Sequence, residues 1–304
     1  MMKRILNLIA ILALPFCMAI LSGCSSEEGK LTAQMAQLEK DLAQSPNAPL
    51  ADSLIAICQQ WMALHANDPA RQAEGMQRQA AALAKTGRAA QAMTQLKALL
   101  QKYHDAPAAP AAALTLANLY KEQLGSTSAA YAIYQLMPEA FPNSDKLAEA
   151  EKLLPGKLLP LSQRIDSMAT RIVNPETGQL DARTANDYIQ SCELSALLLP
   201  QSPNAAQMLY KAGEVSRAAG AFDKALLYYE QVGSQYSEHD RASEALFMRA
   251  FTLDNDLKRY EEAKVLYEEF LQKYPKDDFA DDAQFLMQNL GKSEEELFKA
   301  LENR

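Results

Sequence analysis

The sequence has few of the residues from which metal sites are built. Its 304 residues include only three histidines and four cysteines. His65, His104 and His239 lie far apart, without a histidine or cysteine at ligand spacing. The acidic segment 276–283 lacks the glycine and the twelfth-position glutamate of a calcium loop, and its acids suit the first turn of a helix. We therefore expect no metal and no cofactor.

Sequence motifs of catalysis are also missing. The chain has no phosphate-binding Walker loop, no G-x-S-x-G elbow and no dinucleotide fingerprint. Neighbouring carboxylates such as Glu261 and Glu262 are the residue types of an acid and a base, but nothing predicts the buried cleft that would separate their pKa values. We expect a protein that is not an enzyme.

Strand-forming runs and excess positive charge are absent as well. Alanine, leucine, glutamine, lysine and glutamate dominate, without alternating runs of valine, isoleucine and threonine, so the composition predicts an all-α protein. Apolar residues make up 48% and charged residues 22%, which is typical of a globular chain. The formal charge of −8 argues against a nucleic-acid partner.

The N-terminus has the pattern of a secretory signal. Lys3 and Arg4 precede an apolar run, residues 5–21, that contains Pro15 and is short for a membrane-spanning helix. The following "LSGC" ending at Cys24 resembles the lipobox of bacterial lipoproteins. That resemblance implies a cleaved signal peptide, residues 1–23, and a diacylglycerol on the Cys24 thiol. We expect residues 24–30 to be a lipidated linker.

The residues after the predicted anchor bear on its location. Ser25 stands where many such lipoproteins sorted to the outer membrane have a residue other than aspartate, and "SSEEGK" resembles a tag for surface display. We expect an outer-membrane location and favour the periplasmic face over the cell surface. Cys58 and Cys192 are the two cysteines left besides Cys17 of the leader and the lipidated Cys24. We favour free, buried thiols at these two positions, and a disulfide between them is the alternative.

An internal repeat runs through the chain. In four places an alanine is followed eleven residues later by an aromatic residue, and within each half the two alanines are 38 residues apart. An amphipathic segment precedes each alanine, so each unit is predicted to be two helices joined by a turn, with Gly87, Gly125 and Gly220 ending first helices. The small side chain allows close helix approach, and the ring fills the gap to the next unit. The four pairs are Ala92 with Tyr103, Ala130 with Phe141, Ala225 with Tyr236, and Ala263 with Tyr274.

The C-terminal units resemble the tetratricopeptide repeat. The period is four residues longer than the usual thirty-four, as in repeat lipoproteins of β-barrel assembly and in the Tol-Pal-associated division coordinator. Ser216 and Asp254 depart from the usual tyrosine, and Phe251 stands where glycine is preferred. The matching positions are Leu209, Ala212, Gly213, Phe222, Ala225 and Tyr229, then Phe247, Ala250, Tyr260, Ala263, Tyr267 and Pro275.

A larger duplication relates the two halves of the chain with an offset of 133 or 134 residues. It predicts a TPR-like α-α superhelix of two tandem halves, 31–155 and 156–304, each with about three helix pairs. The first pairs would be about 31–44 with 50–66 and about 158–173 with 181–199. The two prolines and the glycine of residues 153–160 form the joint, and a last helix would begin with a capping box at Ser293.

The resemblance implies a groove lined by the first helix of each pair, where such repeats hold a peptide or a partner helix. Tyr210 and Met248 are the strongest candidates, with the alternative that both pack between repeats. The full set of candidates is Gln77, Thr115, Tyr210, Glu214, Arg217, Met248, Thr252 and Asn255.

These features together predict a non-catalytic, lipid-anchored scaffold or adaptor whose partners are envelope proteins or peptides. A surface-exposed lipoprotein that binds a glycan or another small ligand is the alternative. The identity of the partner and the oligomeric state stay open.

Overall fold

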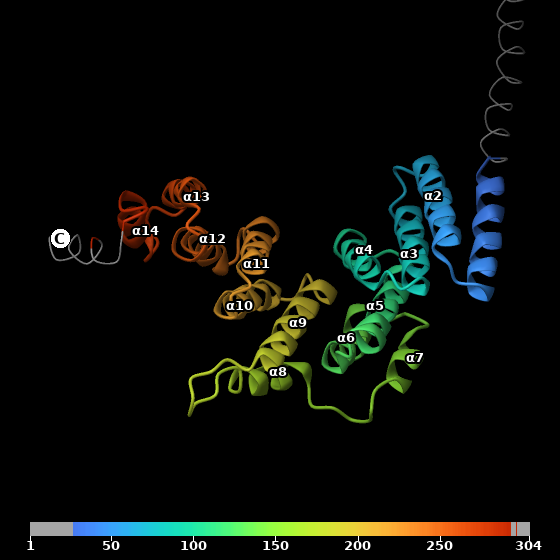
Figure 1. Ribbon diagram of the computed structural model, residues 1–304, viewed down its shortest axis with the longest axis horizontal. Helices are drawn as coiled ribbons and strands as arrows, with labels where there is room; N and C mark the ends of the chain where they lie inside the picture. The colour runs from blue at the N-terminus through green and yellow to red at the C-terminus, as the bar shows by residue number, and fades with distance from the viewer. Residues whose placement is uncertain (1–26, 293–295, 297–304) are drawn as a thin grey trace, which may run out of the picture. The chain divides into compact units, whose positions relative to one another are not determined.

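The computed structural model describes residues 27–292 and residue 296, and within them helices alternate with short turns. The β pairing among these residues is a single bridge between Val173 and Leu180. A helix of residues 27–44 comes first, followed by α2 (Ala48–Leu64), α3 (Pro69–Lys85), α4 (Ala89–Lys102), α5 (Ala109–Gln123), α6 (Thr127–Ala140), α7 (Leu147–Lys152), α8 (Leu161–Ala169), α9 (Ala182–Leu198), α10 (Ala205–Ala218), α11 (Phe222–Gln235), α12 (Arg241–Phe251), the π-helix η1 (Thr252–Asp256), α13 (Tyr260–Lys273) and α14 (Ala280–Gln288) (Figure 1). The predicted all-α class is confirmed.

The predicted signal peptide, Cys24 and the capping box at Ser293 lie outside the described residues. Among the helices that the structure describes, none is both long enough and apolar enough to cross a membrane. Residues 27–30 of the expected linker are helical, so the helix that was predicted from about residue 31 extends further toward the N-terminus.

The chain divides into two compact units. Unit 1 holds the residues up to Gly125 together with Ser144–Lys146, and unit 2 holds Ser126–Asn143 together with the chain from Leu147 onward. The repeat-based halves were predicted to meet near residue 155, so the compact units divide at a different point. The cause is α6, which packs on α9 and α7.

Unit 1 is a run of helices that pack in chain order. α2 packs on α3, α3 on α4, and α4 on α5. The helix of residues 27–44 contributes Met35 to a core that also contains Leu54, Cys58 and Trp61. The Sγ atom of Cys58 lies 3.5 Å from the Sδ atom of Met35. Burial raises the pKa of the Cys58 thiol to about 12, and the Cys192 thiol of unit 2 is likewise free, buried and shifted to about 12.

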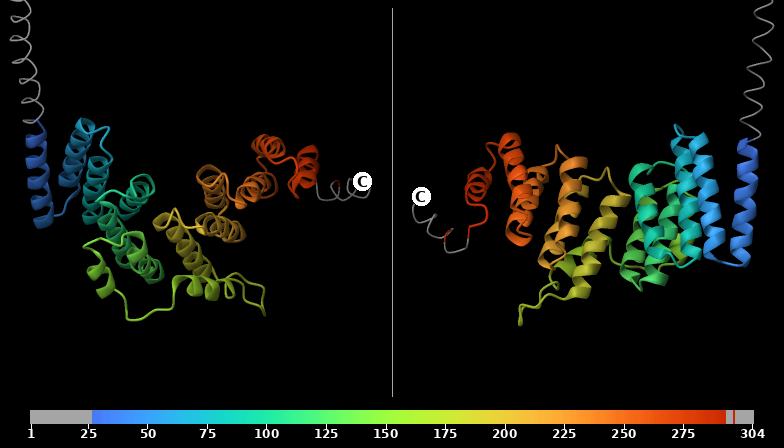
Figure 2. Two further views of the ribbon diagram at one scale, coloured as in Figure 1. Left: turned by 180° about the vertical axis from the view of Figure 1, so that it is seen from behind. Right: turned by 45° about the horizontal axis from the view of Figure 1, so that its top comes forward.

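Unit 2 continues the same pattern. From α9 to α14 each helix packs on the next, as the ribbons show in Figures 1 and 2. Aromatic side chains fill the end of this stack, where the Phe247 ring centroid lies 5.7 Å from that of Phe270 and 6.1 Å from that of Tyr267. Within each unit, consecutive packed helices give the arrangement expected of TPR-like α-α stacking.

The repeat positions have the same structural role in all four predicted places. The four alanines are completely buried. The four aromatics are the residues that end the second helices, and the N–H of each donates to the carbonyl four residues earlier. The Tyr236 hydroxyl also donates to the carbonyl of Pro200 over 3.2 Å, a contact that the spacing did not predict. These C-cap residues are Tyr103, Phe141, Tyr236 and Tyr274.

Helix boundaries repeat with the offset that the sequence duplication predicted. α2 and α9 are each 17 residues long and start 134 residues apart. α4 and α11, and likewise α6 and α13, start and end 133 residues apart. Even the caps correspond, because the side chains of Asn47 and Asp181 each accept a hydrogen bond from a backbone N–H in the first turn.

The residue after the first helix of a pair takes the left-handed backbone conformation. Gly87, Gly125 and Gly220 have φ values of 75°, 63° and 74°. At the fourth equivalent position stands Lys258, with φ 56°, and it is the one described residue other than glycine with a positive φ. A Cβ atom makes this conformation unfavourable, so Lys258 is locally strained.

We expect Lys258→Gly to raise the free energy of unfolding by about 0.5–1 kcal/mol, because glycine adopts the left-handed conformation without strain. Urea denaturation followed by circular dichroism measures the change. The matched control is Lys264→Gly in the exposed interior of α13, which should lower stability by a similar amount. A loss of stability in Lys258→Gly would contradict this account of the turn.

Candidate protein-binding face

Six of the eight predicted groove residues lie on the first helices of two successive pairs in unit 2. Tyr210, Glu214 and Arg217 are on α10, and Met248 is on α12. Thr252 and Asn255 follow in η1. We call these six residues the α10–α12 face. Gln77 on α3 and Thr115 on α5 are half-buried residues of unit 1.

Two members of the α10–α12 face are buried. The Tyr210 ring lies 5.7 Å from the Tyr229 ring and 4.9 Å from the Arg241 guanidinium, measured to ring centroids. Burial, with Glu214 and Glu244 nearby, raises the pKa of Tyr210. Thr252 is fully buried, and its hydroxyl donates to the carbonyl of Met248 over 2.7 Å. Tyr210 therefore packs between helices, which was the alternative to its predicted role in binding. Thr252 is also inaccessible to a partner.

Arg217 joins α10 to η1. Its Nε donates to Oδ2 of Asp256 over 2.5 Å, and its Nη2 donates to Oδ1 over 3.2 Å. The guanidinium also lies 4.8 Å from the centroid of the Phe251 ring. The side chains of Arg217 and Asp256 are only 25% and 14% exposed, so this two-pronged ion pair is shielded from water. Arg217 is thus a structural residue of the face.

The remaining three residues are the accessible part of the face. Glu214 and Asn255 are exposed, and Met248 is half-buried. Partial burial and the nearby Glu244 raise the pKa of Glu214, while Arg241 and Lys211 oppose the shift. A carboxylate, an amide and a thioether offer a polypeptide both polar and apolar contacts.

A cavity of about 380 Å³ adjoins Asn255. Its lining combines the end of η1 with the turn before α13 and the residues after α14. The Asp254 carboxylate lies in this lining, and burial raises its pKa although the Tyr267 hydroxyl donates to it over 3.4 Å. Its lining side chains include Phe251, Asp254, Asn255, Lys258, Tyr260, Asn289 and Lys292.

The sequence prediction missed the residues that connect the two first helices. Arg241 at the start of α12 donates from Nε to Oε1 of Gln207 over 2.6 Å and forms an ion pair with Glu244. Gln207 and Arg241 are 34 residues apart, which is four residues fewer than the 38-residue repeat, so they do not occupy equivalent repeat positions. A search for polar partners between the start of one first helix and the first helix of the preceding pair could have found this contact. An alignment of equivalent repeat positions could not, because the two residues are not equivalent.

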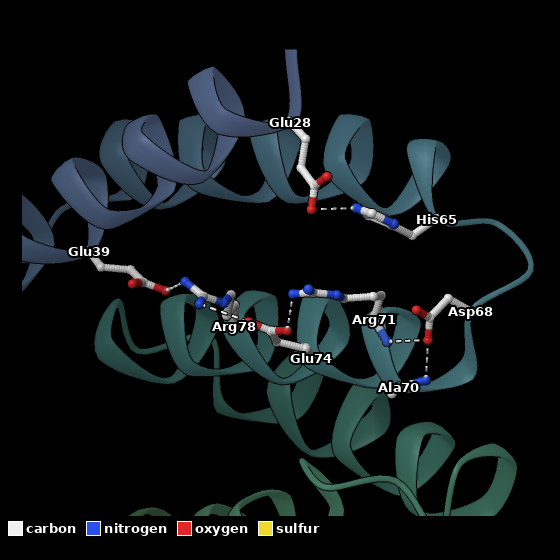
Figure 3. Close-up of polar contacts among 8 residues, drawn as sticks. All are labelled: Glu28, Glu39, His65, Asp68, Ala70, Arg71, Glu74 and Arg78. Atoms are coloured by element: carbon white, nitrogen blue, oxygen red, sulfur yellow. Dashed lines mark hydrogen bonds and ion pairs between the residues drawn. The ribbon is translucent and has the colours of Figure 1, made fainter. Parts of the chain in front are cut away.

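Unit 1 has a comparable network on α3, shown in Figure 3. Arg78 donates to Glu39 of the first helix and to Glu74, both over 2.9 Å. Arg71 lies 3.3 Å from Glu74 and 5.4 Å from the centroid of the Trp61 ring. Near the start of the first helix, His65 Nε2 lies 3.2 Å from Glu28 Oε1. The Arg78–Glu39 pair joins α3 to the first helix, and the predicted groove residue Gln77 is the neighbour of Arg78 in the sequence.

Comparison with known families identifies the C-terminal repeats. The tetratricopeptide repeat family matches residues 207–239 and 244–277, which cover α10 with α11 and α12 with α13. Comparison with curated proteins finds no match. Across residues 27–292 and at residue 296, no group of three or more histidine, cysteine, aspartate and glutamate side chains is placed to hold a metal ion.

The family match supports a tetratricopeptide-repeat protein. Such repeats are typically non-catalytic scaffolds for protein–protein interaction. The matched segments contain all six residues of the α10–α12 face. A protein partner is therefore the class of ligand that this part of the chain supports.

We expect a double-mutant cycle with Arg217→Ala and Asp256→Ala to give a coupling free energy of about 1–2 kcal/mol, because the pair is two-pronged and largely buried. Denaturant unfolding of the four proteins measures it. The control cycle uses Arg259 and Glu262, an exposed pair one helical turn apart, whose coupling should be much smaller. Equal coupling in the two cycles would contradict the structural role of Arg217.

Proposed function

We propose that the protein is a lipid-anchored scaffold or adaptor of the bacterial outer-membrane envelope that binds other envelope proteins through its tetratricopeptide repeats. The observation that carries the proposal is the family match over residues 207–239 and 244–277, where exposed Glu214 lies on α10, half-buried Met248 on α12 and exposed Asn255 in η1. The "LSGC" sequence ending at Cys24 supports the lipid anchor.

The anchor would act by confinement. Two or three acyl chains on Cys24 would hold the protein on a bilayer, since each buried methylene contributes about 0.8 kcal/mol. Partners attached to the same membrane then meet the protein at a raised effective concentration. Modest contacts at the α10–α12 face would suffice for capture under these conditions.

The tether would also be short. Only Ser25 and Ser26 lie between Cys24 and residue 27, the first described residue of the helix. At about 3.5 Å per residue, which is the limit for a fully extended chain, three residues can reach no further than roughly 10 Å. A lipid on Cys24 would therefore keep the first helix of unit 1 next to the bilayer surface.

We expect the triple variant Glu214→Ala, Met248→Ala and Asn255→Ala to reduce partner capture about tenfold or more, because it removes the accessible contacts of the face while leaving Tyr210 and Arg217 in place. Crosslinking in intact cells, followed by quantification of captured proteins, measures the effect. The control variant is Leu227→Ala with Val265→Ala, which changes two exposed side chains of the second helices α11 and α13. Undiminished capture by the triple variant, with normal helicity, would remove the face from the binding site.

We expect Cys24→Ala to release the protein from the membrane fraction, because the variant has no thiol to accept the lipid. Fractionation of cells by density gradient measures the distribution. Cys17→Ala is the control, since it changes a cysteine within the predicted leader and keeps the anchor. Outer-membrane recovery of Cys24→Ala equal to that of the unaltered chain would overturn the proposed lipidation.

A further inference from the structure

A second pocket in unit 2, separate from the α10–α12 face, concentrates positive charge. Its volume is about 380 Å³, and α6, α8, the start of α9 and the segments flanking α8 contribute its walls. The chain as a whole has 38 acidic and 30 basic side chains, whereas this lining has three arginines and one carboxylate. Its residues are Ser128, Leu159, Arg164, Ser167, Met168, Arg171, Arg183, Thr184 and Asp187.

The three arginines have no close anionic partner. Arg164 donates from Nη1 to Oε1 of Gln135 over 2.7 Å, and from Nη2 to the carbonyl and the hydroxyl of Ser128, both over 3.3 Å. Arg171 donates from Nε to the carbonyl of Ser167 over 3.0 Å. In the part of the chain that the structure describes, none of Arg164, Arg171 and Arg183 has a carboxylate oxygen within 4 Å.

Arg171 and Arg183 are exposed, whereas the partial burial of Arg164 is unfavourable without a counter-charge. Arg164 is half-buried, and loss of water around its guanidinium lowers its pKa. Burial likewise raises the pKa of Asp187, and the more distant Arg183 and Arg164 only partly offset this shift. A half-buried cation bonded solely to neutral oxygens is stabilised when an anion enters beside it.

The side chains that line the pocket indicate which anion would bind there. Guanidinium groups bind the oxygens of phosphate in two-pronged geometry. The Ser128 hydroxyl accepts from Arg164 and keeps its own hydrogen for donation, and Ser167 adds a second hydroxyl. Three arginines and one carboxylate leave a net charge of +2, which complements a phosphate dianion better than a single carboxylate.

We infer that the pocket of Arg164, Arg171 and Arg183 binds a phosphate group. The phosphate could belong to a free phosphate compound or to a lipid headgroup, because exposed Leu159 adds an apolar wall to the pocket. The inference is independent of the proposed scaffold function, since it uses none of the residues of the α10–α12 face.

The test uses the purified full-length chain. Calorimetric titration with inorganic phosphate at constant ionic strength examines the free-phosphate source. Flotation with phosphatidylcholine vesicles that contain or lack phosphatidic acid examines the lipid source. We expect saturable binding in at least one arm, and the arm that shows it identifies the source. Absence of binding in both arms would overturn the inference.

Two variants connect that binding to the pocket. Arg171→Gln with Arg183→Gln should weaken phosphate binding more than about tenfold, because the variant loses charged hydrogen bonds to the phosphate. The bonds of Arg164 to α6 should stay intact. Asp187→Asn should tighten phosphate binding several-fold by removing the one negative charge of the lining. The control, Arg249→Gln with Arg259→Gln, removes two arginines outside the pocket and should bind normally. Equal weakening in the two double variants would assign the effect to general charge and overturn the inference. Weaker binding by Asp187→Asn would overturn it as well, because it would contradict the charge balance of the pocket.

Discussion

Close approach of helix pairs at a methyl-sized side chain is the constraint on which this structure depends. Ala225 and Ala263 have no exposed surface, and they are 38 residues apart on α11 and α13. A larger side chain at either position would separate helices that now touch and would open voids around the neighbouring residues. The aromatic residue eleven positions later ends the same helix, so one short sequence element sets both the packing distance and the helix length.

The two matched repeats meet the constraint with different side chains. Gly213 on α10 faces the Tyr229 ring so closely that an added Cβ would lie 2.6 Å from a ring carbon. The equivalent residue of the next repeat is Phe251, whose ring stacks near Phe247 with centroids 6.2 Å apart. There the equivalent tyrosine, Tyr267, directs its hydroxyl to Asp254 instead. The two departures from the usual repeat pattern, Phe251 and Asp254, thus change the packing of this repeat together. The π-helix η1 forms at the same place.

Much of the fold could be predicted from the sequence because the repeat encodes local interactions. The buried alanines and the glycine turns follow from residues near one another in the chain, and the 133-residue offset between helix boundaries follows from the sequence duplication. The helical conformation of residues 27–30 was missed, since the two glutamates there suit a linker equally well. Lys258 in the left-handed conformation was missed for a related reason. Its backbone geometry is imposed by the helices on either side, whereas its side chain gives no sign of it.

The candidate site was harder to predict, because a repeat position does not determine accessibility. Tyr210 and Thr252 occupy first-helix positions and are nevertheless buried. Arg241 lies over the Tyr210 ring, and the Thr252 hydroxyl already donates to the Met248 carbonyl. Several charges of the first helices are used in contacts with other elements, as with Arg217 and Asp256. The arginines around Arg164 differ, because the carboxylates near them are too few and too distant to pair. Arg78, which is half-buried like Arg164, has Glu39 and Glu74 as anionic partners, so a half-buried Arg164 without such a partner indicates a ligand more directly than repeat position does.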